Sequence, residues 1–216
     1  MQRIYNQIAG GSLERIAALS DGLFAFGMTL LVLDLKLPEK NLVHSEAQLA
    51  SALADNSERL IVFAMSFLTL GIFWTGQQTQ LTQLARGNRN LGWLHLTFLF
   101  SVAIVPFTTK LLAEFIHLRL ALIVYWINIL ALGATLYLSW GYAVRAGLVK
   151  ADISSSISTA IKHRILIAQA LYAIGAALCV WNIHISIGFI ILLQLYYAVA
   201  PTLSWGRSKS ARPKSP

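Results

Sequence analysis

Long apolar runs separated by short polar segments dominate the pattern of the chain. A helix needs about 20 mainly apolar residues to cross a bilayer. Runs that meet this rule lie at residues 17–37, 60–80, 91–112, 120–144, 165–181 and 185–205. The pattern therefore predicts an all-α integral membrane protein in which residues 1–206 form a single domain of six transmembrane helices.

Three polar stretches have compositions of their own. Residues 38–59 mix acidic residues with Ala and Leu, which predicts a short amphipathic helix on the outer side. Residues 151–162 are rich in Ser, which predicts a solvated connector. Residues 207–216 are basic and rich in Pro and Ser, which predicts a disordered cytoplasmic tail with weak affinity for anionic lipid.

The first apolar run differs from an ordinary lipid anchor because polar residues flank and interrupt it. Arg15, Ser20 and Asp21 precede it, whereas Thr29 and Asp34 fall inside it or at its far end. An ionisable group at membrane depth needs a partner. The simpler alternative is that Ser20 or Asp21 caps the N-terminus of the helix and complements its dipole.

Helical geometry arranges this run into two faces. At 100° per residue, one stripe holds Phe26, Leu30, Leu33 and Leu37 with Thr29 beside it, and Asp21 points about 140° away from Phe26. One face is suited to line a path and another to hold the helix against its neighbours. Packing or lipid contact is the commoner role of such an apolar stripe.

Other polar and aromatic residues lie near the same end of the second and third predicted helices. They are Trp74, Gln77, Gln78, Asn90, Trp93 and His95. We expect them either to complete a network with Arg15 and Asp21 or to form an interfacial aromatic belt.

Composition and charge support the membrane assignment. Hydrophobic residues make up 56% of the chain, charged residues 12%, and the mean hydropathy is +0.63. The net charge of +8 does not indicate nucleic-acid binding, because the basic residues lie between the apolar runs and in the tail. The single cysteine, Cys179, allows neither a disulfide framework nor a thiolate metal site. The first run lacks a cleavage site after it, so we expect it to remain in the mature protein.

The distribution of Lys and Arg among the segments between the runs predicts the orientation. Of the 17 basic residues, one side receives Lys36, Lys40, Arg59, Lys110 and Arg119, and the other side receives the remaining twelve. Both termini are therefore expected in the cytoplasm.

Motifs for catalysis and for a carbonyl-lined filter are missing. The sequence has no HExxH, GxSxG or P-loop, and its five His residues are dispersed. Gly141-Tyr142 stands alone and not within a TVGYG filter. We therefore expect neither an enzyme nor a bound cofactor or structural metal. No internal repeat is evident, so a symmetric pore would require several copies of the chain.

The residues of the first run resemble a known signature. Arg15, then Leu19-Ser20-Asp21-Gly22, then FAFGMTLLVLDL is similar to the first helix of the transmembrane protein 175 family, bacterial relatives of the endosomal and lysosomal potassium channel. Trp74 to Gln78 takes the place of a family Trp-x-x-His-His, and residues 93–112 resemble the third helix. The resemblance implies a bacterial plasma-membrane homotetramer whose first helices line a potassium-permeable pore.

The resemblance also implies roles for residues of the first run. The narrow hydrophobic constriction falls on Phe26, the next apolar layers on Leu30 and Leu33, and the threonine associated with selectivity on Thr29. Arg15, Ser20 and Asp21 are implied to hold the helix against its neighbours.

The chain departs from the family pattern at three places. Leu19 replaces a Phe, Phe26 replaces an Ile or Leu, and Gln77-Gln78 replaces the His pair. Four Phe rings would either seal the path or present their π-faces to cations. Gln can still donate and accept hydrogen bonds in an inter-helix network.

These observations favour a passive channel that conducts potassium in preference to sodium through a hydrophobic gate. Asp34 is expected either to concentrate cations at the outer mouth or to be an interfacial carboxylate near Lys36. A proton-coupled secondary transporter with Asp21 and His95 as proton carriers is the main alternative. An assembly protein without transport, with Phe26 in packing, is the third.

Overall fold

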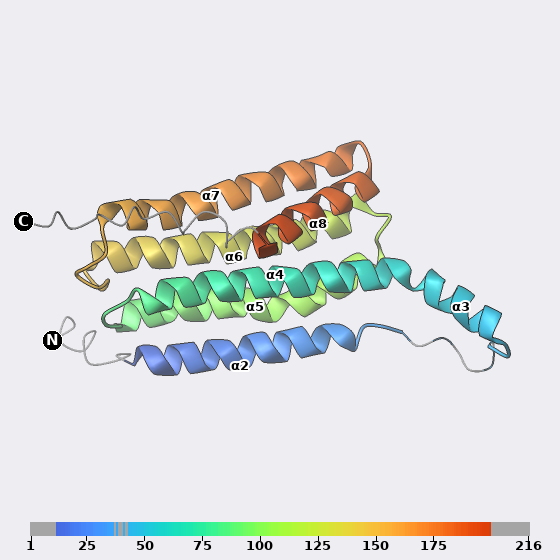
Figure 1. The fold of residues 1–216 in the computed structure, drawn as a ribbon, viewed down its shortest axis with the longest axis horizontal. Coiled ribbons are helices and arrows are strands. Elements are labelled where there is room, and N and C mark those ends of the chain that lie inside the picture. Colours follow the sequence, from blue (N-terminus) through green and yellow to red (C-terminus); the bar gives the residue numbers. More distant parts are fainter. Residues whose placement is uncertain (1–11, 37, 39–40, 42, 200–216) are drawn as a thin grey trace, which may run out of the picture.

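The computed structural model describes residues 12–36, 38, 41 and 43–199, and in this part the chain is helical. The elements in order are α2 (Leu13–Val32), α3 (Glu46–Asp55), α4 (Ser57–Thr82), α5 (Arg89–Glu114), α6 (Arg119–Arg145), α7 (Ser155–Ala177), the 3-10 turn η2 (Leu178–Val180) and α8 (Ile183–Val199). Figure 1 shows the long helices side by side, with α3 projecting beyond one end of the bundle. The all-α prediction is confirmed.

Each of the six predicted apolar runs forms a helix, although the lengths differ from those expected. Within the described residues, five helical segments are long and apolar enough to cross a membrane: α2, α4, α5, α6 and the continuous segment from α7 through η2. The sixth, α8, is apolar but has only 17 residues in the described part. The end of the predicted sixth run, at 200–205, and the predicted tail at 207–216 lie outside the described residues.

The first helix begins earlier in the chain than predicted. Its N-cap is Ser12, whose side chain accepts a hydrogen bond from the Arg15 backbone nitrogen at 3.3 Å. Ser20 and Asp21 lie two turns further on, so the alternative that either one caps the helix is wrong. The helix ends at Val32, with Leu33 as its C-cap.

The Ser-rich segment 151–162 is a connector only in its first few residues, so that prediction is wrong for the remainder. Ser154 caps α7 by accepting a hydrogen bond from the Ile157 backbone nitrogen at 3.4 Å, and the helix runs from Ser155. A cluster of serines is typical of loops, but serine is also a favoured N-cap, and here it starts a helix.

The predicted short helix within residues 38–59 is present as α3. Ser45 caps it by accepting from the Gln48 backbone nitrogen at 3.3 Å, and α4 follows almost directly from Ser57. All of its residues are at least partly exposed, as expected for a solvated helix outside the bundle.

The bundle core forms where α4, α5 and α6 pack together. Its largest fully buried side chains include Tyr125 and Trp140 of α6 and Phe98 of α5. Phe24 of α2 joins this core, with its ring centroid 6.0 Å from that of Phe98. The packing fixes which face of α2 turns inward.

A buried polar cluster, formed by Ser66, Thr69, Thr109, Tyr125 and Gln194, links four helices inside the bundle. The Tyr125 hydroxyl lies 3.0 Å from Thr69 Oγ1 and accepts from Ser66 Oγ at 3.3 Å. Thr109 donates to Ser66 at 2.8 Å, and Gln194 Nε2 donates to Thr69 at 2.7 Å. Such bonds hold helices together where no water competes, so this cluster joins α4 and α5, on which α2 packs, to α6 and α8.

Candidate functional site

The two sides of α2 differ sharply in burial. Its fully buried residues are Ser20, Phe24, Gly27 and Leu31, which recur with helical spacing and pack toward α4 and α5. On the opposite side Phe26 is 61% exposed and Leu33 is 75% exposed, and Leu19, two turns before Phe26, is half exposed. A single copy of the chain therefore leaves an apolar face of α2 uncovered.

The predicted stripe falls on this uncovered face. Phe26, Thr29 and Leu33 are exposed, and Leu30 is half-buried at the edge of the face. Leu33 lies at the helix C-cap, and Leu37 lies outside the described residues. The geometry of the stripe over residues 26–33 agrees with the prediction from periodicity.

The Thr29 hydroxyl has one fixed hydrogen bond. It donates to the Phe26 carbonyl oxygen at 2.8 Å. Since a hydroxyl has one proton and two lone pairs, this bond leaves the Thr29 oxygen available as an acceptor. An exposed oxygen next to Phe26 can replace part of the water shell of a cation.

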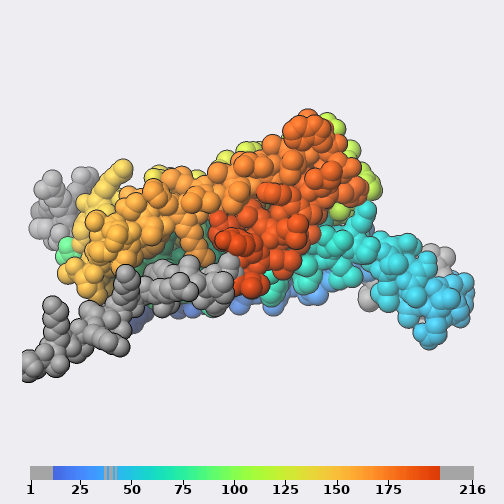
Figure 2. All heavy atoms as spheres, turned by 45° about the horizontal axis from the view of Figure 1, so that its top comes forward, coloured from blue at the N-terminus to red at the C-terminus, as the bar shows by residue number. Residues whose placement is uncertain are grey.

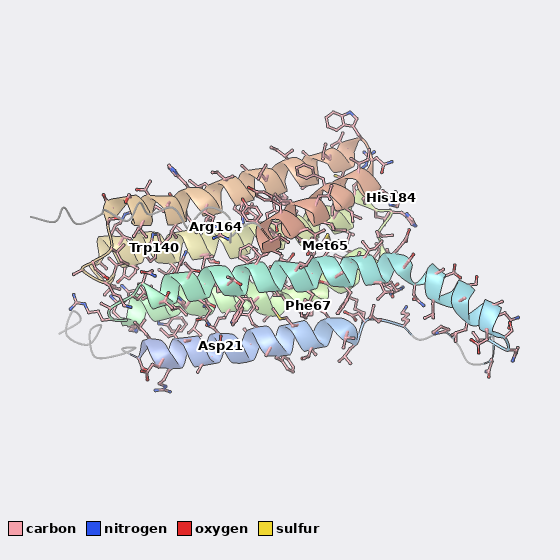
Figure 3. All side chains as sticks on the ribbon, viewed as in Figure 1. Asp21, Met65, Phe67, Trp140, Arg164 and His184 are labelled. Carbon is pink, nitrogen blue, oxygen red and sulfur yellow. The ribbon has the colours of Figure 1, made fainter. Side chains whose placement is uncertain are left out.

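Asp21 connects α2 to α4 through its carboxylate. Trp74 Nε1 donates to Asp21 Oδ1 at 2.8 Å, and Gln78 Nε2 donates to the same oxygen at 2.6 Å. Hydrogen bonds to a charged acceptor are stronger than those between neutral groups. Figure 3 shows Asp21 part-way along α2, and its two partners lie toward the Thr82 end of α4.

A second contact lies on the buried side of the same turn. Gln77 Nε2 donates to Ser20 Oγ at 2.9 Å, and Ser20 donates to the Ile16 carbonyl at 2.8 Å. Ser20 and Gln77 are both fully buried. Two successive residues of α2 thus contact two successive residues of α4: Ser20 binds Gln77, and Asp21 binds Gln78.

Three other predicted members of the network lie apart from it. Among the described residues, no hydrogen bond or ion pair joins Arg15, Trp93 or His95 to Asp21. His95 is buried between α5 and α6, where its Nδ1 lies 3.0 Å from the Leu91 carbonyl oxygen and 3.3 Å from Ser139 Oγ. Trp93 is 59% exposed, as expected of an interfacial aromatic side chain.

The opposite end of α2 carries an ion-pair group that sequence reasoning missed. Lys110 Nζ lies 3.5 Å from Asp34 Oδ1, and Glu114 binds both Lys36 at 2.7 Å and Arg59 at 2.5 Å. Asp34 is therefore paired with Lys110 of α5, and Lys36 has a different partner. The clue in the sequence was that all of these charges fall at the same predicted side of the membrane.

Within the described ranges, no group of three or more His, Cys, Asp or Glu residues is placed to hold a metal ion. What the arrangement provides is an exposed apolar face that carries one hydroxyl, that of Thr29, on a helix whose other side makes a polar contact with α4.

Comparisons with known proteins point to one family. The sequence model described as "Endosomal/lysosomal potassium channel TMEM175" matches residues 15–106. A potassium channel of Chamaesiphon minutus is 30% identical over 189 residues, which cover 86% of this chain and 93% of that protein. The human endosomal/lysosomal proton channel TMEM175 is 24% identical over 187 residues, which cover 84% of this chain and 36% of the human protein.

A solved structure is also similar. It is the crystal structure of a lysosomal potassium-selective channel TMEM175 homolog from Chamaesiphon minutus, with a TM-score of 0.74 and 28% sequence identity. The match covers 87% of this chain and 97% of that one. The likeness therefore extends over nearly the whole helical bundle and not only over the signature of α2.

Proposed function

The chain belongs to the TMEM175 family, and we propose that it is a channel of a bacterial plasma membrane that conducts potassium in preference to sodium. The bacterial relative named a potassium channel and the similar crystal structure support this proposal. The five long apolar helices support insertion in the membrane, and the distribution of basic residues supports cytoplasmic termini. Potassium is the permeant ion, and the channel needs no cofactor.

The uncovered face of α2 is the observation that carries the proposal. Phe26 at 61% and Leu33 at 75% exposure lie on a helix whose other face is firmly packed on α4 and α5. In a homotetramer, four such faces would meet around the symmetry axis. The chain lacks an internal repeat, so several copies are the simplest way to build a symmetric path.

The chemistry of this face suits a hydrophobic gate. Rings of Phe26, Leu30 and Leu33 would make a permeating ion lose water, or would expel water from the path when it is narrow. Potassium holds its water less tightly than sodium and so meets the lower barrier. The free lone pairs of Thr29 would replace part of the lost hydration shell.

The contact between α2 and α4 would keep this face directed at the path. Trp74 and Gln78 hold the Asp21 carboxylate, and Gln77 holds Ser20 one residue earlier. At the other end, Asp34 would attract cations toward the outer mouth, with Lys110 reducing its effect. Asp21 in this scheme positions the helix and does not carry protons.

Proton permeation is a second candidate, because the human relative is named a proton channel. The proton-coupled transporter is less well supported. His95 bonds within α5 and to α6, and Asp21 bonds to α4, so the two proposed carriers belong to separate groups of contacts. An assembly protein without transport would also expose α2, and only a flux measurement distinguishes it.

Recordings in planar bilayers test the proposal. The purified protein is placed between potassium on one side and sodium on the other, and then between solutions that differ only in pH. We expect step-like currents that reverse toward the potassium equilibrium potential. Reversal toward the proton potential would replace potassium by protons as the permeant ion. Silent bilayers, with vesicle flux only under a proton gradient, would favour the transporter instead.

A further inference from the structure

A groove of about 440 Å³ runs between α4, α6 and α7, on a part of the bundle to which α2 contributes no residue. Its walls include Phe73, Leu136 and Ile161, and Figure 2 shows a hollow beside α7. The lining of the groove reaches Gln83 and Ser156, at the end of the bundle that the basic residues predict to be cytoplasmic. At that end the groove reaches the predicted level of the lipid headgroups.

Two polar groups in the groove lack a partner in the protein. Gln80 is only 2% exposed, and its Nε2 atom makes no hydrogen bond with any described residue. The Oε1 atom of Gln169 is buried and, within the same described ranges, also has no partner. An unsatisfied buried donor is costly, so the donor of Gln80 indicates a bound acceptor or water.

Arg164 of α7 supplies a positive charge at the same place. It lines the groove together with Tyr197, and its position part-way along α7 is labelled in Figure 3. In the part of the chain that the structure describes, no carboxylate forms an ion pair with Arg164. A cation among apolar walls near the membrane edge requires an anion or water.

We propose that this groove binds an anionic phospholipid of the cytoplasmic leaflet. The phosphate accepts hydrogen bonds from Arg164, and an acyl chain lies along Phe73, Leu136 and Ile161. A free phosphate ion would leave these apolar walls uncovered, whereas a phospholipid fills both parts of the groove. Water satisfies Gln80 Nε2 and Gln169 Oε1, which are both buried. The groove shares Arg164 and Tyr197 with a second cavity that Asp21 also lines, but it includes no residue of the exposed face of α2. Lipid binding there does not depend on ion conduction.

Lipid retention measured by native mass spectrometry tests the proposal. The full-length protein is reconstituted in equimolar phosphatidylglycerol and phosphatidylcholine and then released from the bilayer. We expect phosphatidylglycerol to be retained selectively, at one molecule per chain. Arg164→Gln removes a charge-assisted pair and should lower this retention about tenfold. Lys162→Gln is the matched control, because it removes the same charge from α7 outside the groove lining and should have no effect.

A second variant fills part of the groove with a larger side chain. Ala168→Phe places a ring against its apolar wall and should displace the lipid while the protein still melts in a single transition. Equal retention of the two lipids, or equal effects of Arg164→Gln and Lys162→Gln, would overturn the proposal. Dissociation of the oligomer by Ala168→Phe with unchanged lipid retention would also overturn it, since a second copy of the chain would then occupy the groove. None of these readouts depends on channel current.

Discussion

Trp74 donates its indole N–H to Asp21 across the contact between α4 and α2, with 2.8 Å between Nε1 and Oδ1. The same oxygen accepts from Gln78, so one carboxylate is held by two donors one turn apart on α4. Asp21 is the residue to which the channel and transporter accounts give different roles. Two hydrogen bonds from α4 to the Asp21 carboxylate are what is expected of a residue that positions α2.

Replacing Asp21 separates these two roles. Asp21→Asn keeps an oxygen acceptor for Trp74 and removes the titratable group. We expect potassium current to persist in Asp21→Asn, whereas Asp21→Ala should lower stability by about 1–2 kcal/mol through loss of both bonds. Thermal melting and bilayer recording on the same preparations measure both effects. Loss of all transport in a fully folded Asp21→Asn protein would instead assign proton transfer to this residue.

The hydrogen bond between Ser20 and Gln77 should stabilise the protein less than expected for two fully buried side chains. Gln77 donates to Ser20, but its Oε1 atom has no partner among the described residues, so the amide is only half satisfied. A double-mutant cycle with Ser20→Ala and Gln77→Leu is expected to give a coupling of about 0.6 kcal/mol. A coupling above about 2 kcal/mol would show that further groups join this contact in the assembled protein.

Substitutions at Gly27 test how closely α2 approaches α4. A Cβ atom there would lie 3.7 Å from Leu70 Cδ1, which is an ordinary van der Waals contact. Gly27→Ala should therefore fold and gain up to about 1 kcal/mol from helix propensity. Gly27→Leu should push α2 away from α4 and lower the melting temperature. Equal melting temperatures for the Leu and Ala variants would contradict this packing.

The ion pair between Lys110 and Asp34 predicts opposite effects for its two members. Asp34→Asn should lower inward cation current at low ionic strength, because it removes a negative charge just beyond the end of α2 that the basic residues predict to face outward. Lys110→Gln should raise that current, because it leaves the Asp34 charge uncompensated. Both effects should fade in high salt as charges are screened. Unchanged conductance in both variants at low salt would remove Asp34 from the conduction path.

The helices and the exposed face of α2 could be predicted from the sequence because both follow from simple patterns. Hydropathy marks apolar runs, and 100° per residue separates Phe26 from Asp21. Helix boundaries were predicted less well where a capping serine lies outside the apolar run, as Ser12 and Ser154 do. Hydropathy does not record which polar side chain accepts the first free N–H group.

Contacts between helices were predictable only in part. The positions of Trp74, Gln77 and Gln78 near one end of the second helix suggested a network with Asp21, but not that Arg15 would lie apart from it. The sequence did not indicate that His95 would turn toward Ser139, or that Tyr125 would bind Ser66 and Thr69. Such pairs depend on which helix faces meet, and this is decided by packing of the whole bundle.

The central claim is that ions pass along the exposed face of α2, and cysteine accessibility tests it most directly. The only native cysteine, Cys179, is buried, so it offers little background reaction. Phe26→Cys and Thr29→Cys should each lose current when a positively charged thiol reagent is added during recording. Phe107→Cys is the matched control, because Phe107 is 65% exposed but lies on α5, and its current should not change. Block at Phe107→Cys with unaltered current at residues 26 and 29 would contradict the account.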